Sequence, residues 1–131
     1  MATTEPVSEE RLKKIIDATR SALTPYVSKP EMLEKYLPKP PFGFLQMVIR
    51  EVIEKSGYAE GLFTPDELNE KLKKEKEEKL DFLKKIINCV ILTMRKNLAI
   101  KPMKVAAGLE PDKTNLFLRM LVECAKNKDK Y

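Results

Sequence analysis

The sequence predicts an all-α fold, a compact single-domain helical bundle of about six or seven helices. Three observations support this class. Apolar residues recur at three- and four-residue steps over several stretches, as on the buried face of a helix. Proline and glycine separate these stretches, and valine and threonine do not form the alternating runs typical of strands. The chain has 131 residues, 43% hydrophobic and 34% charged, a size that fits one domain.

The first two expected helices lie between residues 8 and 36. Ser8 can cap the first helix, and Thr24-Pro25 ends it because a residue before proline is pushed out of the α region. Ser28 and Glu31 have the spacing of a capping box, which predicts a short second helix. The apolar positions of the two helices are Leu12, Ile15, Ile16, Thr19, Leu23, Met32, Leu33 and Tyr36.

The third and fourth helices follow a proline-rich link at residues 38–41, which forbids a continuous helix. The third helix begins at Pro41 or Phe42 and ends at Gly57, a residue suited to a left-handed cap. Its wide apolar face predicts burial on more than one side. The segment Thr64-Pro65-Asp66-Glu67 combines a capping threonine, proline at the first helical position and a reciprocal glutamate. It predicts the start of a fourth helix.

The second half of the chain predicts three further helices. Residues 69–79 contain five lysines and four glutamates, and we expect an exposed loop or solvated helix end that contributes little to binding. A fifth helix ends near Lys96-Asn97, a short sixth opens at Lys101-Pro102 and stops at Gly108, and Pro111 begins the last. The expected inward residues are Leu80, Leu83, Ile86, Ile87, Val90, Ile91, Met94, Leu116, Phe117, Met120, Leu121 and Cys124.

The expected domain covers residues 8–126, with a flexible N-terminus at 1–7 and the start of a linker at 127–131. No secretory signal is recognised, and the longest near-apolar run is too short to span a bilayer, so we expect a cytosolic protein without membrane insertion. Cys89 and Cys124 lie in apolar helical patterns without CxxC spacing, which predicts buried reduced thiols. The methionines, Met103 among them, are expected mostly to fill the core.

The sequence argues against an enzyme. It has no histidine and no glycine-rich phosphate loop, and the carboxylate pairs Glu9-Glu10 and Glu77-Glu78 lie on polar stretches. We therefore expect no catalytic residue, no cofactor and no metal site.

Charge gives the main functional signal. The net charge is +5 and the isoelectric point is about 9.1, which favours anionic partners. Between residues 95 and 104 there are four positive residues and no acid. If these lie on one face they form a cationic binding patch; the alternative is that they only solvate helix ends. The candidate residues are Lys39, Arg95, Lys96, Lys101, Lys104, Lys113 and Arg119. Nucleic acid is not an expected partner, since the basic segment has no aromatic residue to stack on bases.

The order KPPF, an apolar helix, GLF with TPDE, a long helix, and KP-x-K-x-AAG-x-EP-x-x-TN resembles one family. It is similar to the N-terminal calponin-homology-type domain of the intraflagellar transport protein 54 family, complex B subunits also called microtubule-interacting proteins. The resemblance covers about residues 37–126. The family motif has a basic residue at the positions of Lys39, Lys101 and Lys104, and a charged residue at the position of Lys113. Arg95, Lys96 and Arg119 are added from charge and spacing alone.

The resemblance implies a divergent calponin-homology fold that binds tubulin or microtubules and supports cilium assembly. It also implies a location in the cilium or flagellum, basal body and cytoplasm, and contacts with other complex B subunits mainly through regions outside this chain. Two hypotheses remain. The domain binds acidic tubulin through its basic surface, or it is a structural docking domain that uses an apolar groove without touching tubulin. Binding that falls steeply with salt favours the first.

Overall fold

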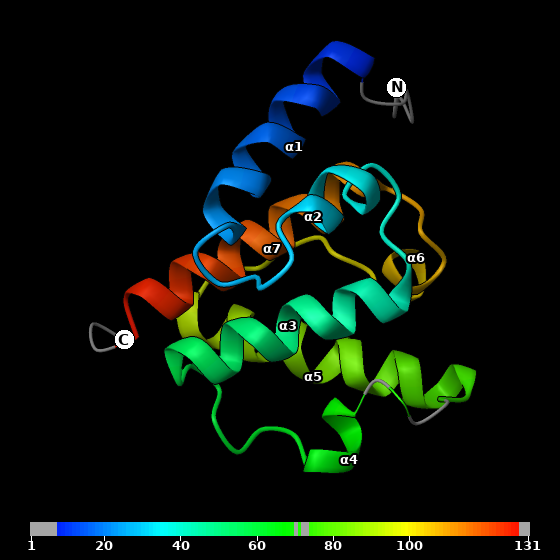
Figure 1. The fold of residues 1–131 in the computed structure, drawn as a ribbon. Coiled ribbons are helices and arrows are strands. Elements are labelled where there is room, and N and C mark those ends of the chain that lie inside the picture. Colours follow the sequence, from blue (N-terminus) through cyan, green and yellow to red (C-terminus); the bar gives the residue numbers. More distant parts are fainter. Residues whose placement is uncertain (1–7, 70, 72–73, 129–131) are drawn as a thin grey trace.

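The computed structural model describes residues 8–69, 71 and 74–128 (Figure 1). Over these residues the chain forms seven helices and no strand, which confirms the all-α prediction. The expected N-terminal segment at 1–7 lies outside the described range, as do residues 129–131 of the expected linker at 127–131. The helices are α1 (Glu9–Leu23), α2 (Glu31–Tyr36), α3 (Phe42–Ser56), α4 (Pro65–Leu68), α5 (Lys76–Met94), α6 (Pro102–Ala106) and α7 (Pro111–Lys126).

Helix α7 lies at the centre of the bundle. It packs along α1 on one side and against α3 and α5 on the other (Figure 1). Helix α3 is buried around most of its circumference, as its wide apolar face predicts: every residue from Phe44 to Ile49 is buried. Such burial removes several large apolar side chains from water, each worth about 1.5–3 kcal/mol. The core therefore forms where α3, α5 and α7 meet.

Three phenylalanines from separate segments form one end of this core. The ring of Phe82 stacks on Phe63 with centroids 4.4 Å apart, and it meets Phe42 edge-on at 5.6 Å. Phe42 ends the KPPF motif and Phe63 ends the GLF motif. The aromatic positions of both motifs therefore hold α3 and the turn before α4 against α5. The inward position of Phe82, which the sequence analysis did not select, supplies their common partner.

Several expected helix ends are confirmed. The Ser8 side chain accepts a hydrogen bond from the N–H of Arg11. At α4 the Thr64 hydroxyl accepts from the N–H of Glu67 at 3.2 Å, and the Glu67 carboxylate accepts from the N–H of Thr64 at 2.9 Å. Helix α3 begins at Phe42 and ends at Ser56, and Gly57 forms its left-handed cap with φ of +79°. These ends are specified by residues within one helical turn, so local sequence predicts them well.

The expected start of α2 is wrong. Ser28 and Glu31 do not form a capping box; Pro30 occupies the cap position, without a side-chain hydrogen bond to the helix. Ser28 instead donates from its N–H and its hydroxyl to the buried carboxylate of Glu51, at 2.8 and 2.6 Å. This carboxylate lies on α3 and would otherwise be an unpaired buried charge. A tertiary contact therefore overrides the local capping pattern.

Two later helices also differ from expectation. Helix α5 ends at Met94, and Arg95 rather than Asn97 takes the left-handed conformation, with φ of +55°. On α7 Leu116 points outward and is 40% exposed, whereas Leu118 and Val122 are buried. The expected inward residues Leu80, Ile91 and Met94 are only half-buried. In the 69–79 run, residues 76–79 form the first turn of α5, while residues 70, 72 and 73 lie outside the described range.

Asn115 joins three parts of the fold. Its side-chain amide is buried and donates to the carbonyl oxygen of Leu37 at 3.0 Å and to that of Pro111 at 2.8 Å. The Thr19 hydroxyl of α1 lies 3.5 Å from the Asn115 carbonyl oxygen. The asparagine of the TN motif is therefore structural. It fixes the link before α3, and with it Lys39, relative to the start of α7.

The cysteines differ in burial. Cys124 is buried, as expected, but Cys89 is only half-buried, and both are free thiols. The Tyr58 hydroxyl lies 2.6 Å from the Thr93 hydroxyl and 3.4 Å from the Cys89 sulfur. Within the described residues, no helix combines the length and apolar character needed to cross a membrane.

Candidate protein-interaction surface

Helix α6 carries the first group of candidate residues. Lys101 occupies its N-cap and Lys104 lies in its last turn; both are exposed. Lys39, in the link before α3, reaches the same helix: a Cβ atom at Gly108, just after α6, would lie 3.5 Å from Lys39 Cγ and Cε. A helix of five residues is only about 8 Å long, so all three lysines surround one short element. We call Lys39, Lys101 and Lys104 the α6 lysine cluster.

Backbone geometry at the end of α6 fixes this arrangement. Gly108 adopts φ of +72°. Its N–H donates to the carbonyl of Val105 at 3.1 Å, and the N–H of Leu109 donates to the carbonyl of Lys104 at 2.9 Å. This pair of bonds is a Schellman motif, which confirms the stop expected at Gly108. A Cβ at Gly108 would meet the aliphatic part of Lys39 at an ordinary van der Waals distance of 3.5 Å, so the left-handed backbone, rather than lack of space, favours glycine here.

The α6 lysine cluster carries uncompensated charge. Over the described residues, none of its three ammonium groups forms an ion pair or side-chain hydrogen bond. Lys113, by contrast, pairs with the Glu110 carboxylate at 3.3 Å, so its charge is partly neutralised. Arg119 is exposed on the outer side of α7 and has no ion-pair partner in the described part of the chain. Lys39, Lys101 and Lys104 are therefore best placed to attract an external anion.

Arg95 and Lys96 lie elsewhere. Helix α5 begins beside α6, since its first residues line a groove with α6. A helix of 19 residues is about 28 Å long, so its two ends are far apart. Arg95 and Lys96 follow its last residue, and the segment at 97–101 runs back to α6 (Figure 1). The structure therefore divides the seven candidates between at least two regions and does not bring them into one patch.

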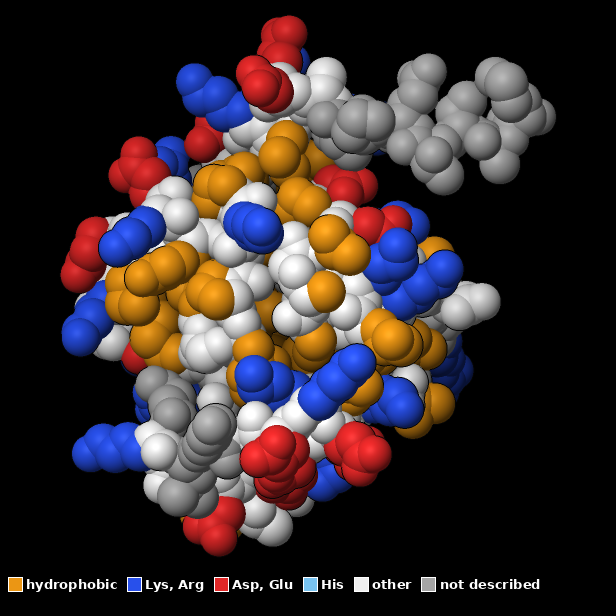
Figure 2. Space-filling model, turned by 90° about the vertical axis from the view of Figure 1, so that its right-hand side faces the viewer, with side chains coloured by type: hydrophobic (Ala, Val, Ile, Leu, Met, Phe, Trp, Pro, Cys, Tyr) orange, Lys and Arg blue, Asp and Glu red, His pale blue; other side chains and the backbone are white. Residues whose placement is uncertain are grey.

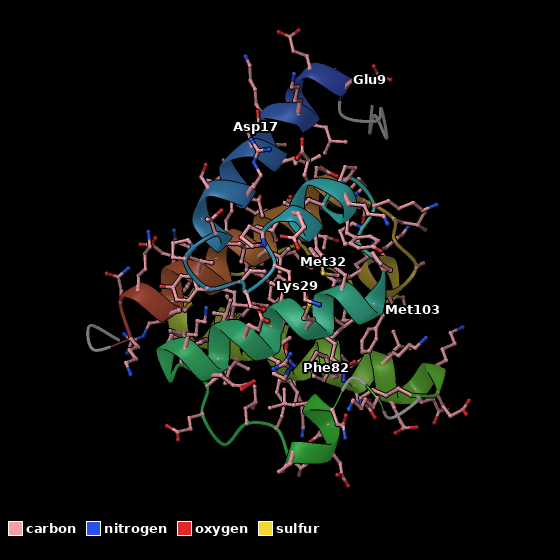
Figure 3. All side chains as sticks on the ribbon, in the orientation of Figure 1. Glu9, Asp17, Lys29, Met32, Phe82 and Met103 are labelled. Carbon is pink, nitrogen blue, oxygen red and sulfur yellow. The ribbon has the colours of Figure 1, made fainter. Side chains whose placement is uncertain are left out.

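A groove of about 430 Å³ lies between the first turns of α5 and α6. Its apolar lining includes Met103, which is 63% exposed, so the expectation of a core position for this methionine is wrong. Figure 2 faces this end of the molecule and shows lysine and arginine side chains among apolar ones. Figure 3 marks Met103 there, above Phe82. The lining residues are Lys74, Glu75, Lys76, Lys79, Leu80, Met103, Ala106 and Ala107.

Sequence reasoning did not single out the lysines of this groove, because it considered only the net charge of residues 69–79. The spacing of Lys76 and Lys79 was an available signal, since residues three apart lie on one side of a helix. Lys79 is also held over the Phe42 ring, 5.6 Å from the centroid. The position of Lys74 beside α6 required the tertiary structure.

The ionisable groups with shifted pKa do not form a catalytic arrangement. Burial raises the pKa of the Tyr58 hydroxyl and of the Cys124 thiol, which moves both groups further from ionising near pH 7. The N–H of Thr64, and then the Lys85 ammonium, lower the pKa of the Glu67 carboxyl. No metal-ligand group of three or more His, Cys, Asp or Glu is found in the described ranges. What the surface offers is charge and apolar area for binding.

The chain is similar to known proteins over most of its length. A family model described as "Microtubule-binding protein MIP-T3 CH-like domain" matches residues 15–127. TRAF3-interacting protein 1 of Danio rerio is 37% identical over 116 residues, which are 88% of this chain and 18% of that protein. The protein of the same name from Mus musculus is 37% identical over 114 residues, 87% of this chain and 18% of the relative. The chain thus spans about 18% of the length of these relatives.

Proposed function

Because the chain belongs to the family of CH-like domains of the microtubule-binding protein MIP-T3, we propose that it binds tubulin or microtubules through the basic surface at α6. The family match agrees with the resemblance noted from the KPPF and TN motifs. That resemblance extends the proposal to a subunit of intraflagellar transport complex B that supports cilium assembly. The corresponding locations are the cilium or flagellum, the basal body and the cytoplasm. Contacts with other complex B subunits are assigned to regions outside this chain.

The α6 lysine cluster carries this proposal. Lys39, Lys101 and Lys104 are exposed and lack ion-pair partners among the described residues, so their charge is available to carboxylates of a partner. They also lie on a rigid support, because the Schellman motif and the buried Asn115 fix the surrounding backbone. A fixed backbone limits the backbone freedom that is lost on binding, and the positive field of the three lysines favours a high encounter rate. We assign no direct contact to the other four candidates; their charges add only to the long-range field around the domain. They are Lys113, Arg119, Arg95 and Lys96.

A docking domain that does not touch tubulin is the second candidate. The observation in its favour is that apolar side chains remain exposed, Leu92 at 76% and Leu116 at 40%. Such residues contribute to protein interfaces when a partner covers them. Binding through them would depend little on salt, because apolar burial is not screened by ions.

A salt-titrated binding measurement with unpolymerised tubulin tests the proposal. The variant Lys101→Glu with Lys104→Glu changes the local charge by four units. Loss of two exposed ion pairs, each worth up to about 1 kcal/mol, predicts roughly ten- to thirtyfold weaker binding. Binding by the wild type should also weaken as salt rises. The melting temperature should stay within about 2 °C of the wild type, since exposed substitutions cost little.

The matched control is Lys13→Glu with Lys14→Glu. Both residues are exposed on α1, whose first turns project away from the body of the domain (Figure 1). The control has the same net charge as the test variant. Equal loss from both variants would mean that net charge, rather than the α6 lysine cluster, governs binding. Unchanged binding after reversal at Lys101 and Lys104 would favour the docking domain.

A further inference from the structure

The groove between α5 and α6 combines an apolar floor with a cationic rim. Leu80, Met103, Ala106 and Ala107 supply apolar lining, and Lys74, Lys76 and Lys79 supply the charge. Its volume of about 430 Å³ falls within the roughly 300–1,000 Å³ range of small-ligand sites. It can therefore accept a few side chains of an extended segment, but not a folded domain. Met103 belongs to the same helix as Lys104, so the groove adjoins the α6 lysine cluster.

Three lysines outnumber the single acid, Glu75, in the described lining, so three positive charges and one negative charge leave a net charge of +2. Glu75 and Glu78 form a reciprocal capping box, in which each carboxylate accepts the N–H of the other residue. The bond to the Glu78 carboxylate is 3.1 Å long. Lys76 forms no ion pair in the described part of the chain. Among the described residues, Lys74 donates only to the backbone carbonyl of Asp66, at 3.4 Å. The groove therefore complements an anion.

The exposure of Met103 adds a requirement for an apolar side chain. A methionine with 63% of its surface in water contributes binding energy when a partner covers it. Its unbranched side chain can also adjust to partners of different shape. An acidic ligand without an apolar group would use the rim and leave the floor in contact with water.

We propose that this groove binds an acidic segment of tubulin that inserts one apolar side chain against Met103 and Leu80 while its carboxylates face Lys74, Lys76 and Lys79. This proposal rests on the tubulin binding proposed above, and it names the part of the partner that the surface at α6 recognises. The α6 lysine cluster would contact the carboxylates that continue beyond the groove.

Two labelled synthetic peptides test the groove directly. One is a short run of glutamates with a central phenylalanine, and the other has serine in its place. The wild-type domain should bind the phenylalanine peptide roughly tenfold more tightly, as expected for partial burial of an aromatic ring. Met103→Gln should remove this preference. Lys76→Glu should weaken both peptides while leaving the fold intact, because a glutamate suits the first turn of a helix.

The matched controls lie further along α5. Leu92→Gln alters an exposed apolar residue and Lys84→Glu an exposed lysine, both away from the groove lining. Neither control should change either peptide affinity. Thermal unfolding of all four variants checks that each is folded. A phenylalanine preference that persists in Met103→Gln, or that Leu92→Gln removes equally, would overturn the proposed floor.

Tubulin itself separates the two proposals. Met103→Gln should weaken binding of intact tubulin, and this effect should disappear with tubulin from which the acidic tails have been removed. Tubulin binding that is unaffected by Met103→Gln and Lys76→Glu, with no peptide binding, would overturn the groove proposal and leave the α6 lysine cluster standing. A phenylalanine preference without any tubulin binding would overturn the proposed function and the tubulin assignment, and support a groove for another acidic peptide.

Discussion

Substitution of Gly108 tests the backbone geometry on which the α6 surface depends. Its φ of +72° costs a residue with a Cβ atom about 1–2 kcal/mol. An alanine Cβ would lie 3.5 Å from Lys39 and would not clash, so no steric overlap adds to this strain in Gly108→Ala. Alanine also lowers the conformational entropy of the unfolded chain relative to glycine, which stabilises the fold by about 0.4–1 kcal/mol. We therefore expect a net loss of about 0.5–1 kcal/mol, with a larger loss for Gly108→Val.

Gly43 supplies the matched control. It lies in α3, and no atom lies within 4 Å of the position that its Cβ would take. Gly43→Ala should therefore stabilise the domain by about 0.5–1 kcal/mol through helix propensity and unfolded-state entropy. The two alanine variants should thus differ by about 1–2 kcal/mol in their free energy of unfolding. Gly108→Asn should cost less than Gly108→Val, because asparagine tolerates a left-handed conformation.

Urea unfolding followed by circular dichroism measures this series, and melting temperatures provide a second measure. For a domain of this size, 1 kcal/mol corresponds to about 4 °C. Equal stability of Gly108→Ala and Gly43→Ala would refute the left-handed assignment. A cost for Gly108→Asn as large as that for Gly108→Val would show that space beside Lys39, rather than φ, limits this position.

The remaining predictions concern stability elsewhere in the fold. Thr64→Ala should lower the free energy of unfolding by about 1 kcal/mol through loss of the α4 cap; an unchanged urea midpoint would contradict this. Leu83→Ala and Ile87→Ala should each cost roughly 2–5 kcal/mol, because both side chains are buried on α5; neutrality at both would contradict the packing. In the folded domain the pKa of the Glu67 carboxyl lies below its ordinary value of 4.5. Its stabilisation of the fold is therefore complete above pH 4.5, and it is lost as the pH falls through the lower, folded pKa. Between pH 6 and about pH 3, the free energy of unfolding should fall less for Glu67→Gln than for the wild type.

Local signals predicted much of the fold. The Thr64 capping box and the left-handed glycines at 57 and 108 each depend on residues within a few positions, so the sequence sufficed. The start of α2 could not be predicted, because Ser28 bonds Glu51, which is 23 residues away. The outward position of Leu116 was missed because apolar residues fill more of α7 than its buried face can accept.

The arrangement of the candidate basic residues was predicted in part. Lys39 comes together with Lys101 and Lys104, although it lies far from them in the sequence. The sequence could not show that the length of α5 keeps Arg95 and Lys96 away from them, since that depends on the direction in which the chain returns to α6 (Figure 1).

The pairing of α1 with α7 has a consequence for how the domain is made. Thr19 and Asn115 are 96 positions apart, and Asn115 reaches back 78 positions to Leu37. During synthesis the first helix emerges long before its partner, so Leu23 and its neighbours lack their final cover until the last helix leaves the ribosome. Such distant pairings delay folding, because long loops must close before their contacts form. A nascent chain that stops before Phe117 should therefore remain incompletely folded and be open to chaperones and proteases.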